Sequence, residues 1–228
     1  MRFDIITIFP KIFDSYFNES MIKRARAKKL VDIRIYDLRK FSRDKHKKVD
    51  DRPYGGGPGM VFKIEPIARV MDSILQNEKQ KIKKTAIILF SASGKQFDKK
   101  IASEWARKYQ RIIMVADHYE GVDERIFKIL QAASHKLQAV SIGPYVLTGG
   151  ELPAMVVIDA VSRHIPGVLG KEESLEEKRQ GVGVPMYTRP EVFEMRGKKY
   201  RVPKVLLSGN HQKIKAWRIK HVQFRKAL

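Results

Sequence analysis

The sequence predicts an α/β fold with a mainly parallel sheet. Two runs, TAIILF (residues 85–90) and RIIMVA (residues 111–116), are apolar after their first residue, which is typical of strands buried on both faces of a parallel sheet. Around them, segments with strand patterns alternate with segments of helical spacing, the order expected of strand–helix–strand units. With 228 residues, of which 43% are hydrophobic, the chain is long enough to bury a full core.

The first half of the chain supplies two strands and two helices. Residues 31–36 (VDIRIY) alternate as a half-buried strand does, and Pro66 suits the first turn of a helix. In chain order, the patterns predict a strand, a helix, a strand and a second helix over residues 1–8, 11–27, 31–36 and 64–75.

The second half of the chain continues the alternation with three more strands and three more helices. The strands are predicted over residues 85–90, 111–116 and 136–142, and the helices over residues 97–109, 124–134 and 152–164. Polar or glycine-containing loops follow these strands: SASGK (91–95), DHYEGVD (117–123) and GPYVLTGG (143–150). In an open parallel sheet the ligand crevice lies beyond the carboxyl ends of the strands. We therefore expect these three loops to converge.

The segment DDRPYGGGPGM (residues 50–60, the glycine loop) is the most unusual stretch of the sequence. Four glycines and two prolines within residues 53–59 exclude a regular helix or strand there. Its bare backbone suits close approach by a phosphate or nucleotide, with Arg52 and Tyr54 supplying charge and a flat face. The alternative is a long turn that only joins two elements. The Gly-Lys-Ser/Thr ending of a nucleotide-binding P-loop is missing.

Charge points to a polyanionic partner. The chain has 46 basic and 25 acidic residues, a formal net charge of +21. Nucleic acid is the first candidate and an anionic membrane surface the second. The alternative is that the excess of positive charge has no partner and reflects a hot or high-salt habitat or simple solubility. No apolar run reaches the roughly 20 residues that span a membrane, and the first residues read as a strand rather than a leader. With no cysteine, the expected compartment is the cytoplasm, and the six histidines show no zinc-site spacing, so no metal ligand is predicted.

A domain boundary is predicted after the last helix. Residues 166–187 contain glycines and a charged run, as a linker does, and residues 188–228 form a small module. From Arg196 onward this module has eleven basic residues and no acidic one. Trp217 and Phe224 lie among these bases, as on a nucleic-acid-binding face. The alternative for Trp217 is a core anchor of the module.

Several long motifs in one order resemble a known family, the bacterial tRNA (guanine-N1)-methyltransferases (the TrmD family, SPOUT class), which methylate guanosine at tRNA position 37. The resemblance covers nearly the whole chain. It rests on MRFDIITIFPKIFD (1–14), KHKKVDDRPYGGGPGMV (45–61), YEGVDERI (119–126), SIGPYVLTGGELPAMVVIDAVSRHIPGVLG (141–170), YTRPEVF (187–193) and VPKVLLSGNHQKIKAWR (202–218).

The resemblance implies a fold, a cofactor and an assembly. The fold is a knotted α/β domain (residues 1–165) with a deep trefoil knot, a linker (166–187) and a small, mostly helical, tRNA-binding domain (188–228). The active form is a homodimer with composite sites. S-adenosylmethionine would bind in the knot, in contact with Ser91, Ala92, Ser93, Gly94, Asp117, Glu120, Gly121, Ile142, Gly143, Pro144, Tyr145, Val146, Leu147, Gly149 and Gly150.

The resemblance also implies residues for catalysis and for RNA binding. Arg163 would stabilise the negative charge that develops on guanine when its N1 proton leaves; the alternative from the residues alone is a surface arginine near a helix end. The residues that would face the tRNA are His46, Asp50, Arg52, Gly55, Gly56, Gly57 and Gly59.

Three loops depart from the family pattern. The usual Ser-Pro-Gln-Gly is Ser-Ala-Ser-Gly at residues 91–94, and Pro144 stands where the family has aspartate. The usual Cys-Gly-Arg-Tyr-Glu-Gly is Ala-Asp-His-Tyr-Glu-Gly at residues 116–121, so Asp117 places a carboxylate where a glycine is expected.

The linker departs most, because the family's general-base aspartate, within Asp-Ser-Phe, is missing. This chain reads SLEEKRQGVGVP (174–185). Counting back from Tyr187 puts Leu175 in the place of the base, whereas matching Gly181 to the family's glycine puts Glu176 there, with Glu177 beside it. A glutamate performs the same proton transfer, so the expected base is Glu176 or Glu177. Whether Mg²⁺ assists that base stays open.

Three functions are compatible with these residues. The first is methyl transfer to N1 of guanosine 37 in tRNA. The second is an RNA-binding relative without catalysis, and the third is a knotted methyltransferase for another RNA. Cofactor binding distinguishes the first from the second, and a panel of RNA substrates distinguishes the first from the third.

Overall fold

The computed structural model describes residues 1–76, 84–132, 136–170 and 184–224. It divides into two compact units, residues 1–169 and residues 170–228, and each unit is described by itself below. Among the described residues, no helix combines the length and the apolar character needed to cross a bilayer.

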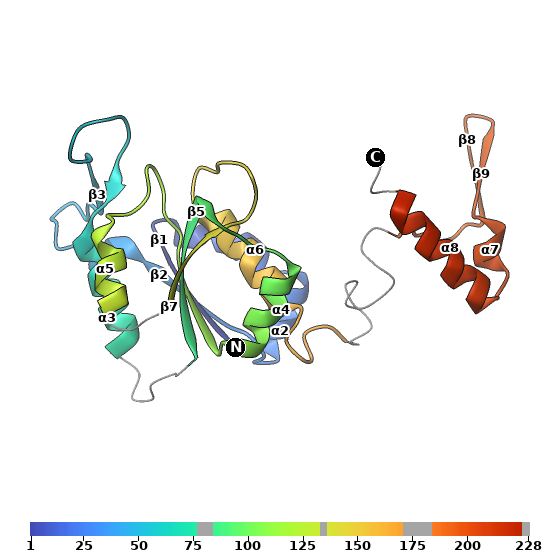
Figure 1. Cartoon of the computed structure of the whole chain (residues 1–228), viewed down its shortest axis with the longest axis horizontal. Helices are drawn as coiled ribbons and strands as arrows, with labels where there is room; N and C mark the ends of the chain where they lie inside the picture. Colours follow the sequence, from blue (N-terminus) through green and yellow to red (C-terminus); the bar gives the residue numbers. More distant parts are fainter. Residues whose placement is uncertain (77–83, 133–135, 171–183, 225–228) are drawn as a thin grey trace. The chain divides into compact units, whose positions relative to one another are not determined.

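The first unit is built on a five-stranded parallel sheet (Figure 1). Every neighbouring pair of strands is parallel; for example, Ile87 lies opposite both Ile113 and Leu137. The prediction of an α/β fold with a mainly parallel sheet is therefore confirmed. In spatial order the strands are β2 (Asp32–Asp37), β1 (Arg2–Thr7), β6 (Arg111–Val115), β5 (Thr85–Gln96) and β7 (Lys136–Ser141).

Helices cover both faces of this sheet, and each face has its own core cluster (Figure 1). Because both faces are covered, the central strands are buried on either side, which explains their continuous apolar runs. One face has α2 (Ser20–Ala27), α4 (Lys99–Lys108) and α6 (Glu151–Ser162), and the other has α3 (Ile64–Gln76) and α5 (Arg125–Ala132).

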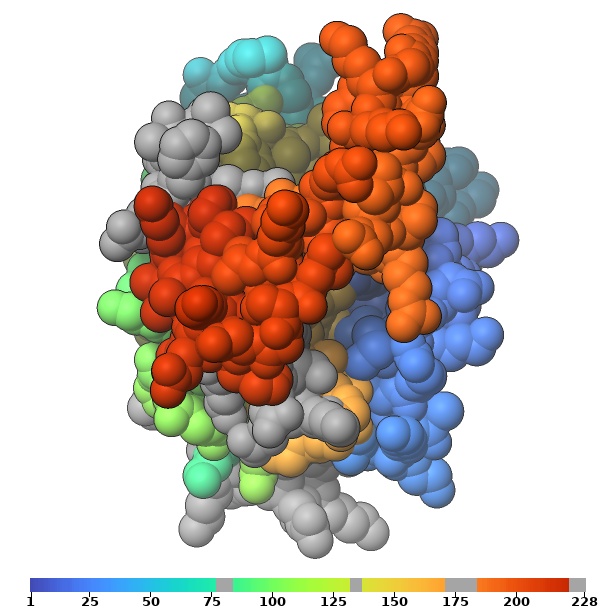
Figure 2. Space-filling model, turned by 90° about the vertical axis from the view of Figure 1, so that its right-hand side faces the viewer, coloured from blue at the N-terminus to red at the C-terminus, as the bar shows by residue number. Residues whose placement is uncertain are grey.

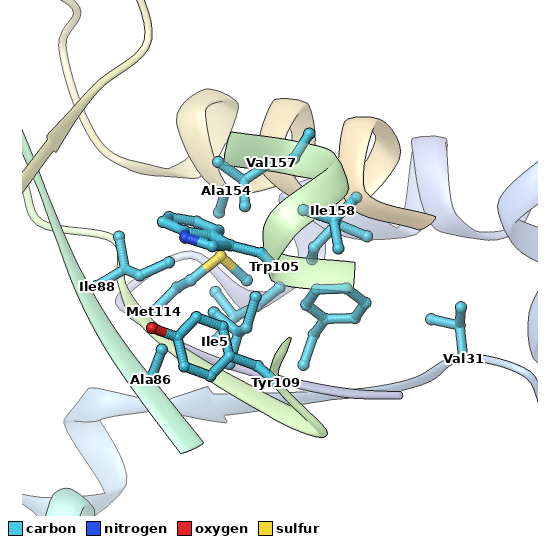
Figure 3. Packing of buried hydrophobic residues seen from close by; sticks show 14 of the residues in the cluster. Ile5, Val31, Ala86, Ile88, Trp105, Tyr109, Met114, Ala154, Val157 and Ile158 are labelled. Atoms are coloured by element: carbon cyan, nitrogen blue, oxygen red, sulfur yellow. The ribbon is translucent and has the colours of Figure 1, made fainter. Parts of the chain in front are cut away.

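Trp105 anchors the core between the sheet and the helices of the first face (Figure 3). Its side chain is 3% exposed and lies beside Met114 of β6 and the α6 residues Ala154 and Val157. Asp98 caps the start of α4, because its carboxylate accepts a hydrogen bond from the backbone N–H of Ile101 at 2.8 Å. The cap and the buried indole together fix α4, and with it the packing of α6.

The single helix predicted over residues 11–27 was wrong. The structure has a 3-10 turn (Pro10–Phe13), a short helix α1 (Asp14–Phe17) and then α2, whose first residue, Ser20, has a φ of +47°. The break is stabilised by Arg26, whose Nη1 donates to the carbonyl of Phe17 and to Asn18 Oδ1. A side chain nine residues downstream thus replaces a helical hydrogen bond, which the spacing of apolar residues does not reveal.

Strand β5 is longer than the predicted strand over residues 85–90. It pairs with β7 up to Phe90 opposite Val140, and pairing resumes with Lys95 opposite the same Val140. Residues 91–94 are therefore looped out of the ladder. Gly94 makes this possible, since a Cβ there would lie 2.5 Å from the backbone nitrogen of Val140.

A buried ion pair lies near the amino ends of the strands. The Asp4 carboxylate is fully buried and accepts a hydrogen bond from Arg111 Nε at 2.5 Å. Arg2 Nη2 approaches the other Asp4 oxygen at 2.9 Å, and Arg111 Nη2 donates to the carbonyl of Ile74 at 3.4 Å. Asp4 therefore joins strands β1 and β6 at the edge of the sheet opposite to the loops that follow the strands.

The second unit contains a β-hairpin that the sequence analysis did not predict. The hairpin is β8 (Val192–Met195) with β9 (Lys198–Arg201), followed by α7 (Lys204–Leu207) and α8 (His211–Phe224). Its two turn residues, Arg196 and Gly197, both have positive φ, which matches the twist of a tight hairpin. Figure 2 shows the hairpin in orange and α8 in red as a space-filling surface.

No side chain among residues 184–221 is fully buried. Trp217 is half-buried, stacked on His221 with ring centroids 4.0 Å apart and set edge-on to Tyr187. It thus organises a small aromatic cluster within the unit, while Met186, Phe193 and Tyr200 are exposed.

Candidate active site

The looped-out residues 91–94 of β5 and the loops that follow β6 and β7 surround one cavity of about 440 Å³. All three begin at carboxyl ends of parallel strands, where an open sheet places its ligands. Most residues expected to bind the cofactor line this cavity: Ser91, Ala92, Ser93, Asp117, Glu120, Gly121, Ile142, Tyr145, Val146, Leu147, Gly149 and Gly150.

Glycines shape the walls of the cavity because other elements pass too close for a side chain. A Cβ on Gly150 would lie 2.6 Å from Ala116 Cα and 3.0 Å from the backbone nitrogen of Asp117. Gly143 does not itself line the cavity, but a Cβ there would collide with the Tyr145 ring, whose hydroxyl donates to the carbonyl of Ile142 at 3.3 Å. The backbone groups of Gly150 are engaged within the protein, since its N–H donates to the carbonyl of Asp117 and its carbonyl accepts from the N–H of Ala154. Gly150 therefore serves the close packing of the wall.

A buried hydrogen-bonded group ties the cavity to the first strand. Glu151, in the first turn of α6, is 3% exposed and accepts a hydrogen bond from Thr7 Oγ1 at 2.8 Å. Its other oxygen lies 3.0 Å from His118 Nε2, and the backbone N–H of Phe9 donates to Thr7 Oγ1. A carboxylate at a helix N-terminus is stabilised by the helix dipole. These contacts fix the start of α6 relative to the loop that contains His118.

Asp117 is an acid in an unfavourable environment. Burial raises the pKa of its carboxyl to about 6, and the nearby negative charge of Glu151 adds to the rise. Its own carbonyl accepts a hydrogen bond from the backbone N–H of Gly150 at 2.8 Å. The side chain therefore sits at the junction between the second and third loops.

The glycine loop is held against the rim of this cavity. It is framed by the short strands β3 (Asp50–Asp51) and β4 (Val61–Phe62). The backbone N–H of Glu120 donates to the carbonyl of Met60 at 3.0 Å, and that of Phe62 donates to Gly121 at 2.9 Å. Gly59 has a φ of +82°, a conformation that favours glycine, and a Cβ there would also force the Glu120 side chain to move.

The residues expected to face RNA are largely open to solvent. His46, Arg52 and the four glycines of the loop are exposed, Tyr54 is fully exposed, and Asp50 is half-buried in β3. Next to Asp50, the pKa of Asp51 is lowered by a hydrogen bond from the backbone N–H of Arg52 and by Lys63. The loop thus presents a cation, an aromatic ring and bare backbone beside the cavity.

Several expected site residues lie elsewhere. Gly94, Gly143 and Pro144 are not among the residues that line the cavity. Arg163 caps the far end of α6, where its backbone N–H donates to the carbonyl of Asp159. It lies ten residues after Pro153, an α6 residue that lines the cavity, which is about 15 Å along the helix at 1.5 Å per residue. Glu176 and Glu177 lie outside the described residues.

The cavity also contains residues that the sequence analysis missed. Phe127 from α5 and Pro153 from α6 line it, as do Val122 and Glu124. Phe127 and Pro153 each lie in the first turns of a helix that follows a predicted loop, and this position was the available signal. Among the described residues, no group of three His, Asp or Glu side chains has the geometry of a metal site.

Comparison with known proteins identifies the family. The family model described as "tRNA (Guanine-1)-methyltransferase TrmD" matches residues 1–228. The chain belongs to the TrmD family. Relatives named tRNA (guanine-N(1)-)-methyltransferase include those of Dictyoglomus turgidum, 48% identical over 223 residues (96% of this chain and 84% of the relative), and Clostridioides difficile, 47% identical over 221 residues (96% and 90%). A third, from Moorella thermoacetica, is 45% identical over 221 residues (96% and 84%).

Gly150 offers a direct test of the cavity in this TrmD family member. We expect Gly150→Ala to weaken S-adenosylmethionine binding about tenfold or more, since overpacking against backbone atoms displaces the loop that forms the wall. Calorimetric titration of the full chain measures the dissociation constant. Gly170→Ala is the matched control, because a Cβ at Gly170 meets nothing within 4 Å. Equal affinities of the two variants would show that the wall tolerates the extra methyl group.

Proposed function

We propose that this protein transfers a methyl group from S-adenosylmethionine to N1 of guanosine at position 37 of tRNA. The observation that supports this most is the pair of backbone hydrogen bonds between the glycine loop and the cavity loop, Glu120 to Met60 and Phe62 to Gly121. They hold a polar, RNA-facing loop at the rim of a cavity suited to a small cofactor. Methyl transfer needs the two substrates within about 3–3.5 Å of each other, so the sites must adjoin.

The residues of the cavity fit the proposed cofactor. Its volume of about 440 Å³ lies within the range of small-molecule sites, roughly 300–1,000 Å³. Ile142, Val146 and Leu147 supply apolar surface for a heterocycle, while Gly149 and Gly150 line the cavity without side chains that would fill it. When bound, the cofactor supplies a methyl group on a sulfonium, which is already a good electrophile.

The chain's own residues then have to prepare the guanine. N1 of guanine is a weak acid, so a carboxylate base, Glu176 or Glu177, takes its proton as N1 forms the bond to the methyl carbon. The guanidinium of Arg163 stabilises the negative charge that spreads over the purine. The glycine loop and Arg52 hold the nucleotide outside its stack.

Arg163 can take this role only if a second copy of the chain supplies it. In one chain the cavity adjoins the first turn of α6 at Pro153, and Arg163 caps the other end, about 15 Å away along the helix. We therefore propose a homodimer with composite sites, in which the cavity of one protomer meets Arg163 of its partner.

The exposed face of α6 supports the proposed dimer. This helix is apolar nearly all round, and such helices are normally covered on every side, yet Leu152 and Val156 are exposed. Phe9, Ile12 and Tyr16 extend this surface, and Tyr16 is tied to α6 by a hydrogen bond to Asp159. A contiguous apolar patch of this kind is typical of a protein interface.

The second unit is proposed to bind tRNA. The stretch from Arg196 onward contains eleven basic residues and no acidic residue. Contacts between such residues and the phosphates of tRNA would make the affinity strongly salt-dependent. We keep residues 1–165, 166–187 and 188–228 as the proposed catalytic domain, linker and tRNA-binding domain. Membership of the TrmD family supports the proposal of a trefoil knot in the first domain, and a tRNA substrate supports the proposal of a cytoplasmic location.

The proposed function is tested by methyl transfer from labelled S-adenosylmethionine to a tRNA transcript with guanosine at positions 36 and 37. We expect activity on this transcript and none on one with adenosine at position 37. Glu176→Gln and Glu177→Gln identify the base, since one of them should lose activity while cofactor binding is unchanged. Activity in both variants would move the base elsewhere. No activity and no cofactor binding in the parent would favour an RNA-binding relative.

A further inference from the structure

The cavity has the opposite charge from the rest of the molecule. Among the residues that the structure describes, its ionisable lining consists of the carboxylates of Asp117, Glu120 and Glu124, the imidazole of His118 and two tyrosines, with no lysine or arginine. The chain as a whole carries a formal charge of +21. A site that lacks basic residues in so basic a protein is suited to a cation rather than to an anion.

Asp117 lies deepest among these carboxylates. Its two oxygens face Gly150 and Gly121, with a Cβ on Gly150 only 3.0 Å from one and a Cβ on Gly121 3.6 Å from the other. The buried Glu151 lies close enough to contribute to the raised pKa of Asp117, and it is itself engaged with Thr7 and His118. Asp117 thus lies near a second carboxylate, that of Glu151 in α6, and a positive ligand would relieve the repulsion between them.

We propose that Asp117 makes the cavity select the cationic methyl donor over its neutral product, which deepens the proposed function and rests on it. S-adenosylmethionine has a positive sulfonium. When the methyl group bonds to N1 of guanine and the N1 proton goes to the base, the sulfur–methyl bond breaks and the sulfur becomes a neutral thioether. The reaction therefore removes the charge that the carboxylate attracts, and the product binds more weakly than the donor.

The position of Asp117 makes this a property of this chain rather than of the pattern it resembles, which has glycine there. A glycine offers space and backbone groups but no charge. Coulomb attraction between unit charges a few ångströms apart at a partly buried site is large enough to change affinity at least tenfold. The same interaction does not act on a neutral ligand.

Calorimetric titration of the full chain with S-adenosylmethionine and with S-adenosylhomocysteine tests the proposal. We expect the parent to prefer the methylated ligand, and Asp117→Asn to lose about tenfold of that preference, which corresponds to about 1.4 kcal/mol. Asp32→Asn is the matched control, since Asp32 is an exposed residue at the start of the edge strand β2. It removes the same charge and should leave the preference unchanged.

The outcomes separate this inference from the function it rests on. An equal loss of affinity for both ligands, or an unchanged preference in Asp117→Asn, would overturn the role of Asp117 while leaving cofactor binding intact. A parent that binds neither ligand would overturn the proposed function itself.

Proton release gives an independent measurement. With a pKa of about 6, Asp117 is about half protonated at pH 6, and a bound cation favours its ionised form. Binding of S-adenosylmethionine at pH 6 should therefore release up to about half a proton, seen as a binding enthalpy that depends on the ionisation enthalpy of the buffer. Asp117→Asn should lose this release. His118, which pairs with Glu151, is present in both proteins, so the difference between them reports on Asp117 alone. Equal release by the two proteins would contradict the assignment.

Discussion

Arg163→Ala is expected to lower kcat about 10²–10³-fold while the dissociation constant for tRNA changes little. Removing a donor that stabilises charge only in the transition state has this signature, and the factor corresponds to about 2.7–4 kcal/mol. Single-turnover methyl transfer at saturating tRNA measures the rate, and filter binding measures the affinity. Arg34→Ala, which removes an exposed arginine from β2, should leave both unchanged.

Two results would contradict this role. A loss of tRNA affinity equal to the loss of rate would show that Arg163 acts in binding. A variant that reacts at the rate of the parent would show that Arg163 has no part in the active site. Far-UV circular dichroism checks that the variant folds, because Arg163 caps α6 and makes contacts of its own.

A mixing experiment tests whether Arg163 acts across a dimer. Arg163→Ala and a variant whose cavity cannot bind the cofactor are each inactive. If they exchange subunits at random, half of the dimers are mixed, and each mixed dimer has one intact composite site, so about a quarter of the parental activity returns. If Arg163 acted within its own chain, the mixture would stay inactive.

Asp4→Ala is expected to lower the free energy of unfolding by about 3–5 kcal/mol. The substitution removes the carboxylate that pairs with Arg111, whose side chain is 2% exposed, and breaking a buried ion pair by removing one partner costs about this much. Urea unfolding at fixed protein concentration, followed by circular dichroism, measures the loss as a lower transition midpoint. The cavity lies at the other edge of the sheet, so cofactor affinity under native conditions should be kept.

Asp32→Ala is the control for this stability measurement. Asp32 pairs with Arg34 at 3.0 Å, but both side chains are more than half exposed, and pairs of this kind contribute at most about 1 kcal/mol. Equal shifts for Asp4→Ala and Asp32→Ala would show that the buried pair contributes no more than a surface pair.

The central strands of the sheet could be predicted from the sequence because strands buried on both faces have continuous apolar runs. TAIILF and RIIMVA lie in β5 and β6, near the centre of the sheet. What it could not predict depends on contacts between distant residues. Arg26 stabilises the break before α2 from nine residues away, and Gly94 lets β5 leave and rejoin the ladder because of its contact with Val140.

The candidate site shows the same division. Its three loops could be located from the ends of the strands, but their contacts could not. The hydrogen bonds between Glu151, Thr7 and His118 join three separated segments. The hairpin of the second unit was missed because its residues, VFEM and KKYR, are mostly exposed and show no apolar alternation. Its only signal is the glycine at the turn.

The second unit has almost no interior among residues 184–221, where every described side chain is at least partly exposed. A fold with so few buried contacts opens locally at low free-energy cost. A ligand that binds only the folded form of this unit raises the free energy of opening, by about 2.7 kcal/mol at a ligand concentration one hundred times the dissociation constant. Under the proposed tRNA-binding role, the lifetime of this unit in the presence of proteases is thereby coupled to the supply of unmodified tRNA.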